Sequence, residues 1–266
     1  MIRLVALDID GTLIAPGAHH SAQPEPDMVA AVHDLVRCGV EVVLASGRMY
    51  PGTASVARHL GLSTPVVCQQ GAATHERDGS LRRSFAIDEE IALALRAYAD
   101  AAGWASAWFD PRRYLVTRST RESEAYAAVS GVPMEIHANP ESLGVTPTGL
   151  DIISSPRAAT TVHDDLARQY GERLALLDFP SVTAIHAPEA SKGRAIADLA
   201  AEWGIGAHEV LAIGDSVNDV SMLEWAGESA APAHATPPAQ RAAKEVLRGE
   251  GVAGVVARLR AVASSN

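Results

Sequence analysis

The sequence predicts an α/β protein with a parallel-sheet core and an inserted α+β domain. Short apolar runs, typical of buried strands, alternate with amphipathic helical patterns near both ends of the chain. The middle of the chain instead mixes short strand patterns with helices. With 266 residues, 47% of them hydrophobic, the chain can form one large core and an insert. We expect residues 1–80 and 187–266 to form the core and residues 81–186 to form the insert.

The first half of the core is predicted from hydrophobic periodicity. Residues 2–7 form a short apolar run, and residues 28–38 have the spacing of an amphipathic helix. A second apolar run covers residues 40–48. Residues 55–62 predict a helix, and residues 65–72 predict another strand. This alternation predicts a parallel sheet that is covered by helices on both faces.

The insert and the second half of the core follow from the same patterns. The strand and helix candidates of the insert are residues 84–88, 104–109, 113–118, 149–154 and 181–187, and residues 89–103 and 158–171. After the insert, residues 191–203 predict a helix, residues 209–215 a strand and residues 216–227 a helix. The Ala- and Pro-rich residues 230–240 predict a loop.

Composition limits the classes of partner and the compartment. The formal net charge of −10 argues against binding to nucleic acid or to an anionic membrane surface, so an anionic substrate would need local cations. The chain has no run of about 18 apolar residues that would predict a membrane span, and no signal peptide is recognisable. Cys38 and Cys68 both adjoin apolar runs, which predicts reduced, buried thiols. We expect a cytoplasmic protein, with a monomer favoured.

Two aspartates stand where the first predicted strand ends. Asp8 and Asp10 lie two residues apart, so they point to the same side of the strand end, and Gly11 permits a tight turn after them. Ligands of open α/β sheets bind beyond the carboxyl ends of the strands, where this pair lies. Two carboxylates so close together need a cation or a shared proton.

Three kinds of site could use such a pair. A calcium loop is disfavoured because its glycine would stand at the sixth position rather than the fourth, and His19 occupies the position of its last ligand. A glycosidase pair would come from separate elements with space between them. A magnesium site with a nucleophilic carboxylate is the third reading, and it requires further groups elsewhere in the chain.

Further polar groups follow other predicted strands. Ser46 and Gly47 end the second strand, where a hydroxyl and main-chain N–H groups can approach a phosphate. Asp215 ends a later strand, and Asn218 and Asp219 follow in the next helical turn. A capping pair between Ser216 and Asp219 would explain part of this pattern, but not Asp215.

Lys192 stands at the start of the helix predicted after the insert. A cation there opposes the helix dipole by about 0.3–1 kcal/mol, so helix formation alone does not favour it. The chain has only two lysines, Lys192 and Lys244, against twenty arginines. The choice of lysine therefore indicates that a compact point charge is needed at this position.

Together these motifs resemble those of the haloacid dehalogenase (HAD) superfamily of aspartate-dependent phosphohydrolases. The segment DIDGTL from Asp8 is similar to the first motif, Ser46 to the second, Lys192 to the third and GDSVND from Gly214 to the fourth. Their order, with an insert between the second and third motifs, resembles the Cof-like branch with a C2-type (IIB) cap. The resemblance covers nearly the whole chain and implies the HAD fold, with a Rossmann-like core and an inserted cap domain.

The resemblance also implies roles for the motif residues. Asp8 would attack phosphorus to give an aspartyl phosphate, and Asp10 would act as general acid and then as general base. Mg²⁺ would be held by Asp8, the main-chain carbonyl of Asp10 and Asp215, and Asp219 would steady Lys192 or the metal site. The residues that would hold the remaining phosphate oxygens are Ser46, Gly47, Lys192 and Asn218.

The sequence departs from the pattern of this branch at two places. It has Gln69-Gln70-Gly71 where members usually have Asn-Gly, and Ala231-Pro232-Ala233 where they usually have Met-Gly-Asn. Neither departure touches the four motifs. Because of both, however, the substrate of a particular relative cannot be assigned to this chain.

We therefore expect a Mg²⁺-dependent phosphatase for a small phosphorylated metabolite, with a sugar phosphate as the favoured class. A phosphomutase of the same fold is the enzyme alternative, and a non-catalytic sugar-phosphate-binding protein is the other. Binding alone would not require both Asp8 and Asp10. The insert contributes none of the four motifs, so we expect it to close over the crevice and to select the leaving group.

Overall fold

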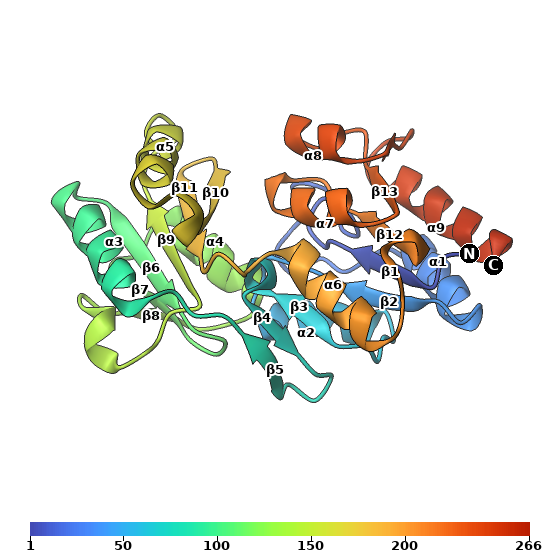
Figure 1. Ribbon diagram of the computed structural model, residues 1–266, viewed down its shortest axis with the longest axis horizontal. Helices are drawn as coiled ribbons and strands as arrows, with labels where there is room; N and C mark the ends of the chain where they lie inside the picture. The colour runs from blue at the N-terminus through green and yellow to red at the C-terminus, as the bar shows by residue number, and fades with distance from the viewer.

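The computed structural model describes residues 1–266 and consists of two lobes that lie side by side (Figure 1). The core lobe contains a five-stranded sheet in which every neighbouring pair is parallel, in the order β14-β13-β12-β1-β2. Its strands are β1 (Leu4–Leu7), β2 (Glu41–Leu44), β12 (Val210–Ile213), β13 (Glu228–Ala231) and β14 (Glu245–Val246). The parallel sheet predicted from the sequence is confirmed.

Helices cover both faces of this sheet because alternate strand residues are apolar on both sides. Val5 and Leu7 of β1 pack in one hydrophobic cluster with residues of α1, α2 and α9. Leu4 and Ala6 pack on the other face with residues of α6, α7 and α8. These helices are α1 (Pro26–Arg37), α2 (Tyr50–His59), α6 (Lys192–Glu202), α7 (Val220–Trp225), α8 (Pro237–Ala242) and α9 (Ala253–Ser265).

A small antiparallel sheet lies beside the core sheet. It consists of β3 (Val66–Cys68), β4 (Ala73–His75) and β5 (Leu81–Ser84). A single parallel bridge between Ala45 and Val67 joins it to the end of β2. The strand that we predicted at residues 84–88 of the insert is wrong in its bounds, because β5 shares only Ser84 with it and pairs with β4 beside the core sheet.

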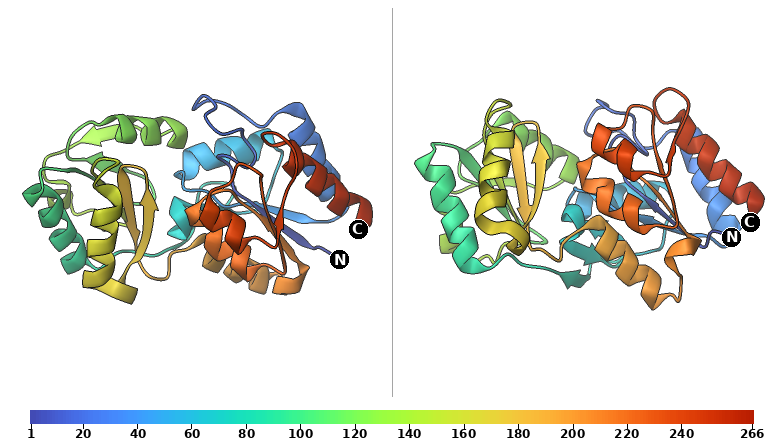
Figure 2. Two further views of the ribbon diagram at one scale, coloured as in Figure 1. Left: turned by 90° about the horizontal axis from the view of Figure 1, so that it is seen from above. Right: turned by 45° about the horizontal axis from the view of Figure 1, so that its top comes forward.

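The second lobe, which we call the cap lobe, comprises the elements from α3 to β11. Its six-stranded sheet has the order β10-β11-β9-β6-β7-β8. The strands are β6 (Ala105–Phe109), β7 (Tyr114–Val116), β8 (Met134–Ile136), β9 (Gly149–Ile153), β10 (Ala175–Phe179) and β11 (Val182–His186). Helices α3 (Glu89–Ala101) and α5 (Ala159–Tyr170) cover one face of this sheet, around Trp108 and Ile152. Both views in Figure 2 show the lobes connected by two chain segments.

The cap lobe contacts the core lobe mainly through α4 (Arg121–Ser130), which packs on α2. Gly52 of α2 makes this close approach possible, because a Cβ atom there would lie 2.3 Å from the carbonyl oxygen of Val129. The main-chain N–H of Met49 donates to Ser130 Oγ at 3.2 Å. These contacts hold the open face of the cap sheet toward the carboxyl ends of the core strands (Figure 2).

Short 3₁₀ helices complete the chain, namely η1 (Gln69–Gly71), η2 (Pro140–Leu143), η3 (Gly171–Arg173), η4 (Ala207–Glu209) and η5 (Val217–Asp219). No helix has both the length and the apolar character needed to cross a membrane.

Two further expectations differ from the structure. Residues 230–240 are not one loop, because β13 extends to Ala231 and α8 begins at Pro237, a residue whose fixed φ suits the first helical turn. Cys68 is buried, but Cys38 is exposed at the end of α1, where its Sγ lies 3.4 Å from the carbonyl oxygen of Ala263. Both thiols are free.

Candidate active site

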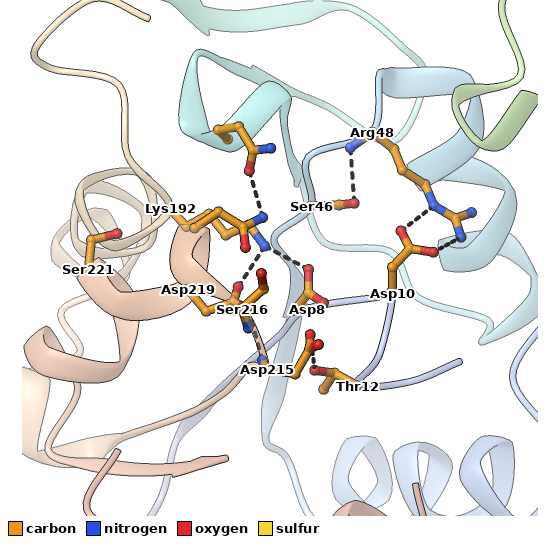
Figure 3. A network of polar contacts seen from close by, with 12 residues as sticks. Asp8, Asp10, Thr12, Ser46, Arg48, Lys192, Asp215, Ser216, Asp219 and Ser221 are labelled. Atoms are coloured by element: carbon orange, nitrogen blue, oxygen red, sulfur yellow. Dashed lines mark hydrogen bonds and ion pairs between the residues drawn. The ribbon is translucent and has the colours of Figure 1, made fainter. Parts of the chain in front are cut away.

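The strand ends of the core sheet bring the motif residues together. Asp8 follows β1 directly, and β1 lies between β2 and β12 in the sheet. Ser46 follows β2 and Asp215 follows β12, so the three residues project from neighbouring parallel strands at the same edge (Figure 3). The main-chain N–H of Asp8 still donates to Ile213 at 3.0 Å, which fixes the position of the aspartate.

Lys192 is fully buried and lies between two carboxylates. Its Nζ donates to Asp8 Oδ1 and to Asp219 Oδ1, each at 2.6 Å (Figure 3). Burial opposes a charged lysine, but Asp219 and Asp8 outweigh this effect and raise the pKa of Lys192 above its ordinary value. The lysine therefore stays protonated, which explains why the chain has a cation at the start of α6.

The backbone around Lys192 is built for close packing. Ser191 caps α6 by accepting a hydrogen bond from the N–H of Arg194 at 3.1 Å. A Cβ atom at Gly193 would lie 2.3 Å from the carbonyl oxygen of Ser221, so only glycine lets α6 approach α7 this closely. This approach places Lys192 beside the fourth motif.

Asp219 is more than a helix cap. Its Oδ2 accepts hydrogen bonds from the N–H groups of Asp215 and Ser216, both at 2.9 Å, and its Oδ1 binds Lys192. The pairing with Ser216 that helix capping predicts is therefore present, but the same carboxylate also fixes Asp215 and the lysine. Both oxygens of Asp219 are occupied by protein donors.

The site carries more negative than positive charge. One oxygen from each of Asp8, Asp215 and Asp219 can be chosen so that all three lie within 4.8 Å of one another. Burial and the carboxylate of Asp219 raise the pKa of Asp8 well above its usual range, and the same two causes raise the pKa of Asp215 to about 6. Three carboxylates against the one ammonium of Lys192 leave two negative charges, which a divalent cation would balance.

Gly11 and Thr12 shape the same corner of the site. Gly11 has φ +89°, and a Cβ atom there would lie 2.3 Å from Asp215 Oδ2. Thr12 Oγ1 donates to Asp215 Oδ1 at 3.5 Å. A larger residue at position 11 would therefore displace Asp215 from Asp8.

Asp10 is held by Arg48, a residue to which sequence reasoning gave no role. Arg48 Nε donates to Asp10 Oδ2 at 2.8 Å, and a second bond joins its Nη2 to Oδ1 (Figure 3). The arginine side chain is only 6% exposed, whereas that of Asp10 is 53% exposed. This two-pronged pair orients the Asp10 carboxylate toward the open side of the site. The position of Arg48, directly after Ser46 and Gly47, was the only sequence signal for this contact.

The predicted phosphate-binding residues surround the same point, and three of them contact neighbouring residues. Ser46 is buried, and its Oγ accepts from the N–H of Arg48 at 3.1 Å. The main-chain carbonyl of Gly47 accepts from the Tyr126 hydroxyl of α4 at 3.0 Å. Asn218 Nδ2 donates to Gln70 Oε1 at 2.7 Å, while its Oδ1 is buried without a partner.

Gln69 and Gln70, the first departure from the family pattern, occupy an unusual turn. Both have positive φ, 49° and 59°, in a region that non-glycine residues rarely adopt. Gln69 Nε2 donates to the carbonyl of Asp110 at 2.6 Å, and Gln69 Oε1 accepts from Thr148 Oγ1 at 2.7 Å. The two glutamines thus connect the site loop to the cap lobe and to Asn218.

A cavity of about 360 Å³ lies between the lobes and opens onto Asp8. Its core wall consists of Asp8, Asp10, Gly47, Arg48, Gln70, Asp215, Ser216 and Asn218. Its cap wall consists of Phe109, Tyr114, Glu122, Tyr126, Val129, Asp151, Ile153, Phe179, Val182, Ala184 and His186. The catalytic candidates and the open face of the cap sheet therefore share one space.

The family of haloacid dehalogenase-like hydrolases matches residues 5–259 of the chain. A phosphoglycolate phosphatase of Aeropyrum pernix is 29% identical, over 96% of this chain and 91% of that protein. A haloacid dehalogenase-like hydrolase from B. subtilis has a similar structure, with a TM-score of 0.85, 23% identity and coverage of 97% and 99% of the two chains. A subclass IIB sugar phosphatase, BT4131, has a TM-score of 0.79 at 18% identity, over 92% and 93% of the two chains.

The chain belongs to the haloacid dehalogenase-like hydrolases, in the Cof-like branch. It is an enzyme of the phosphatase class, and it has the HAD fold that the motifs implied.

Lys192→Ala should lower kcat/KM for a phosphoester by several orders of magnitude. It should also lower the free energy of unfolding by about 3–5 kcal/mol, because it leaves Asp8 and Asp219 buried without their cation. Lys244→Ala is the matched control, since Lys244 binds only the carbonyl oxygens of Ala226 and Gly227. Steady-state kinetics and urea unfolding of both variants would measure this. Equal losses in the two variants would contradict the assigned role of Lys192.

Asp151 on the cap wall gives a prediction about pH. Its burial raises its pKa from 3.8 to about 7, so between these values the unfolded chain releases a proton that the folded protein retains. Ionisable Asp151 must therefore destabilise the fold as the pH rises from 4 to 8. Asp151→Asn should have a higher free energy of unfolding than the wild type at pH 8, by on the order of 3 kcal/mol, with a smaller gain at pH 4.5. Urea unfolding at the two pH values would measure both gains. An equal gain at both pH values, or the same trend in the exposed control Asp164→Asn, would refute this.

Proposed function

We propose that the protein is a Mg²⁺-dependent phosphatase that hydrolyses a small phosphorylated metabolite, with a sugar phosphate as the favoured class, through an aspartyl phosphate on Asp8. One observation carries the proposal. The Asp8 carboxylate is buried at the tip of β1, its Oδ1 is fixed by Lys192, and it opens onto a cavity large enough for a small metabolite. The residues around it combine anionic oxygens for a metal with cationic and hydroxyl groups for a phosphate.

The residues at the strand ends fit a divalent cation of the hard, oxygen-binding kind. We assign Asp8, Asp215 and the main-chain carbonyl of Asp10 as its ligands, since both oxygens of Asp219 are occupied by Lys192 and by main-chain N–H groups. When bound, Mg²⁺ would neutralise the clustered charge and polarise a phosphoryl oxygen.

In the first half-reaction, the Asp8 oxygen that is not fixed by Lys192 attacks phosphorus, and the bond from phosphorus to the leaving-group oxygen breaks. Lys192, Ser46, Asn218 and the main-chain N–H of Gly47 bind the phosphoryl oxygens, whose negative charge spreads as the bond breaks. Asp10 transfers its proton to the departing oxygen. The products of this step are an alcohol and an aspartyl phosphate on Asp8.

In the second half-reaction, a water molecule attacks the phosphorus of the aspartyl phosphate. Asp10 accepts a proton from this water, so it returns to the state in which it began the cycle. The bond between phosphorus and the Asp8 oxygen breaks, which restores the Asp8 carboxylate and releases inorganic phosphate. Arg48 acts as a positioning residue that holds Asp10 at the cavity. Because it binds both carboxylate oxygens, Asp10 must release one of these bonds before it carries the proton that it transfers.

Residues 81–186 are proposed to be the cap domain, and residues 1–80 and 187–266 the catalytic core, although β5 at the start of the first range pairs with β4 beside the core sheet. The sugar phosphatase with subclass IIB architecture supports a sugar phosphate as the substrate class. A phosphomutase of the same fold would have to protect the aspartyl phosphate from water, so sustained release of phosphate separates the two functions. A non-catalytic sugar-phosphate-binding protein would not release phosphate at all. The free thiols of Cys38 and Cys68 support a cytoplasmic location.

Asp8→Asn should abolish turnover while preserving the fold, because an amide is a poor nucleophile of nearly the same shape. Asp10→Asn should lose most of the activity toward substrates with poor leaving groups and less toward p-nitrophenyl phosphate, whose leaving group needs little protonation. Phosphate release and circular dichroism would measure both effects. More than a few per cent of wild-type activity in Asp8→Asn, once deamidation is excluded by mass spectrometry, would reject the nucleophile assignment.

Chelation by EDTA should abolish phosphate release, and Mg²⁺ should restore it, because the proposed ligands are hard oxygen atoms. A readout independent of activity is available, since Mg²⁺ should raise the melting temperature of the wild type but not that of Asp215→Ala. The exposed carboxylate of Asp164 provides the control variant Asp164→Ala. Full activity in the presence of EDTA would rule out the metal site.

A further inference from the structure

The cap wall of the cavity contains two buried polar groups that no hydrogen bond satisfies. Asp151 is 8% exposed and His186 is 2% exposed, yet Asp151 Oδ1 and His186 Nε2 have no partner. Buried polar atoms without a partner are costly and rare, unless a ligand completes them. Both side chains line the cavity that opens onto Asp8.

The strand register places these two groups on one face of the cap sheet. Asp151 of β9 is paired with Ala184 of β11, and His186 lies two residues further along β11. Residues in this diagonal relation lie about 7–8 Å apart, so one small molecule can contact both. Asp151 is paired with Ala107 on its other side. Alanine therefore flanks Asp151 on both neighbouring strands, so its paired neighbours within the sheet are small.

Aromatic rings form the rest of this corner. Phe109 lies 5.8 Å from Tyr126 and 6.2 Å from His186, measured between ring centroids. Phe109 fits here because it leans over Gly149, where a Cβ atom would lie 2.1 Å from its ring. Its position in the cavity wall puts an aromatic ring beside the two polar groups, as is typical of small-molecule pockets, which combine apolar walls with a few polar groups.

The charge of the cap wall restricts what can bind. Its only charged or titratable groups besides the tyrosines are Glu122, Asp151 and His186, with no lysine or arginine among its residues. Arg113 is directed elsewhere and pairs with Glu135. Burial lowers the pKa of His186 to about 4, so the imidazole is neutral near pH 7. A leaving group with a carboxylate would therefore meet carboxyl groups and no cation on this wall.

We propose that Asp151 and His186 form the leaving-group subsite of the enzyme, and that this subsite selects phosphoesters whose leaving group carries hydroxyl or amino donors and no carboxylate. The proposal rests on the proposed phosphatase function and deepens it. Asp151 accepts a hydrogen bond from a hydroxyl or amino group, while His186 offers Nε2 to a second group of the same molecule. Selection against a carboxylate follows from its repulsion by Glu122 and by the ionised fraction of Asp151, and from the lack of a cation on the cap wall.

This assignment predicts a substrate preference that differs from the one in the names of some relatives. Phosphoglycolate, the substrate in the name of the Aeropyrum pernix relative, carries a carboxylate on its leaving group. The cap wall here has no cationic group to pair with that carboxylate. We therefore expect this enzyme to discriminate against phosphoglycolate.

Three matched pairs of phosphoesters test the proposal: phosphoethanolamine against phosphoglycolate, glycerol 3-phosphate against 3-phosphoglycerate, and glucose 6-phosphate against 6-phosphogluconate. In every pair that the wild type hydrolyses, the member without a carboxylate should have a kcat/KM at least about tenfold higher. Asp151→Asn should reduce this ratio by about tenfold, mainly by lowering KM for the carboxylate member. The matched control is Asp178→Asn, since Asp178 lies on β10, two strands from Asp151 in the cap sheet, and accepts a hydrogen bond from Thr160 outside the cavity. It should leave the ratio unchanged.

His186→Phe keeps an aromatic ring but removes both nitrogen atoms. It should raise KM for the member of each pair without a carboxylate, and it should raise KM for p-nitrophenyl phosphate less. A ratio that favours the carboxylate member, or that is the same in Asp151→Asn as in the wild type, would overturn the proposal. So would an equal change in Asp178→Asn. Failure of the wild type to hydrolyse p-nitrophenyl phosphate with Mg²⁺ would instead refute the proposed function itself, so the two failures are distinguishable.

Discussion

The burial of one ammonium group between two carboxylates is the constraint on which the rest of the structure depends. Lys192 at the start of α6 can reach Asp8 only if α6 lies close against α7, and Gly193 permits that approach. Asp219 holds the other side of the lysine and, through its second oxygen, fixes the main chain at Asp215 and Ser216. A buried ion pair of this kind is a weak source of stability but a strong source of geometry. It orients the Asp8 carboxylate before any substrate arrives.

The two lobes divide the chemistry from the choice of substrate. The core wall carries anionic oxygens and Arg48, with Lys192 buried against Asp8, whereas the cap wall is apolar and aromatic around two polar groups without partners. Contacts made by a leaving group with the cap lie far from the reacting bond, so they can discriminate between substrates without altering the catalytic residues. The contact of Tyr126 with the carbonyl of Gly47 joins the cap helix directly to the phosphate-binding loop.

The turn at Gln69 and Gln70 links these two parts. Consecutive non-glycine residues with positive φ are strained, and such strain persists only when surrounding contacts hold it. Here Gln69 binds Asp110 and Thr148 of the cap lobe, and Gln70 binds Asn218 of the fourth motif. This single turn therefore contacts both the cap lobe and Asn218, a proposed phosphate-binding residue. Its side chains are long enough to make these contacts, whereas the shorter Asn-Gly of the family pattern would reach less far.

The sequence by itself determined the parallel core and which polar residues follow its strands, because both depend on local spacing. Asp8 and Ser46 follow apolar runs whose period fixes where the strands end, and parallel strands bring those ends together. It could not reveal the partner of Arg48, since the contact with Asp10 spans two strands and depends on a side-chain direction. It also could not single out Asp151 or His186. In sequence these are ordinary residues of two cap strands, and only the register of β9 and β11 and the packing of the cap against the core place them opposite Asp8 in one cavity.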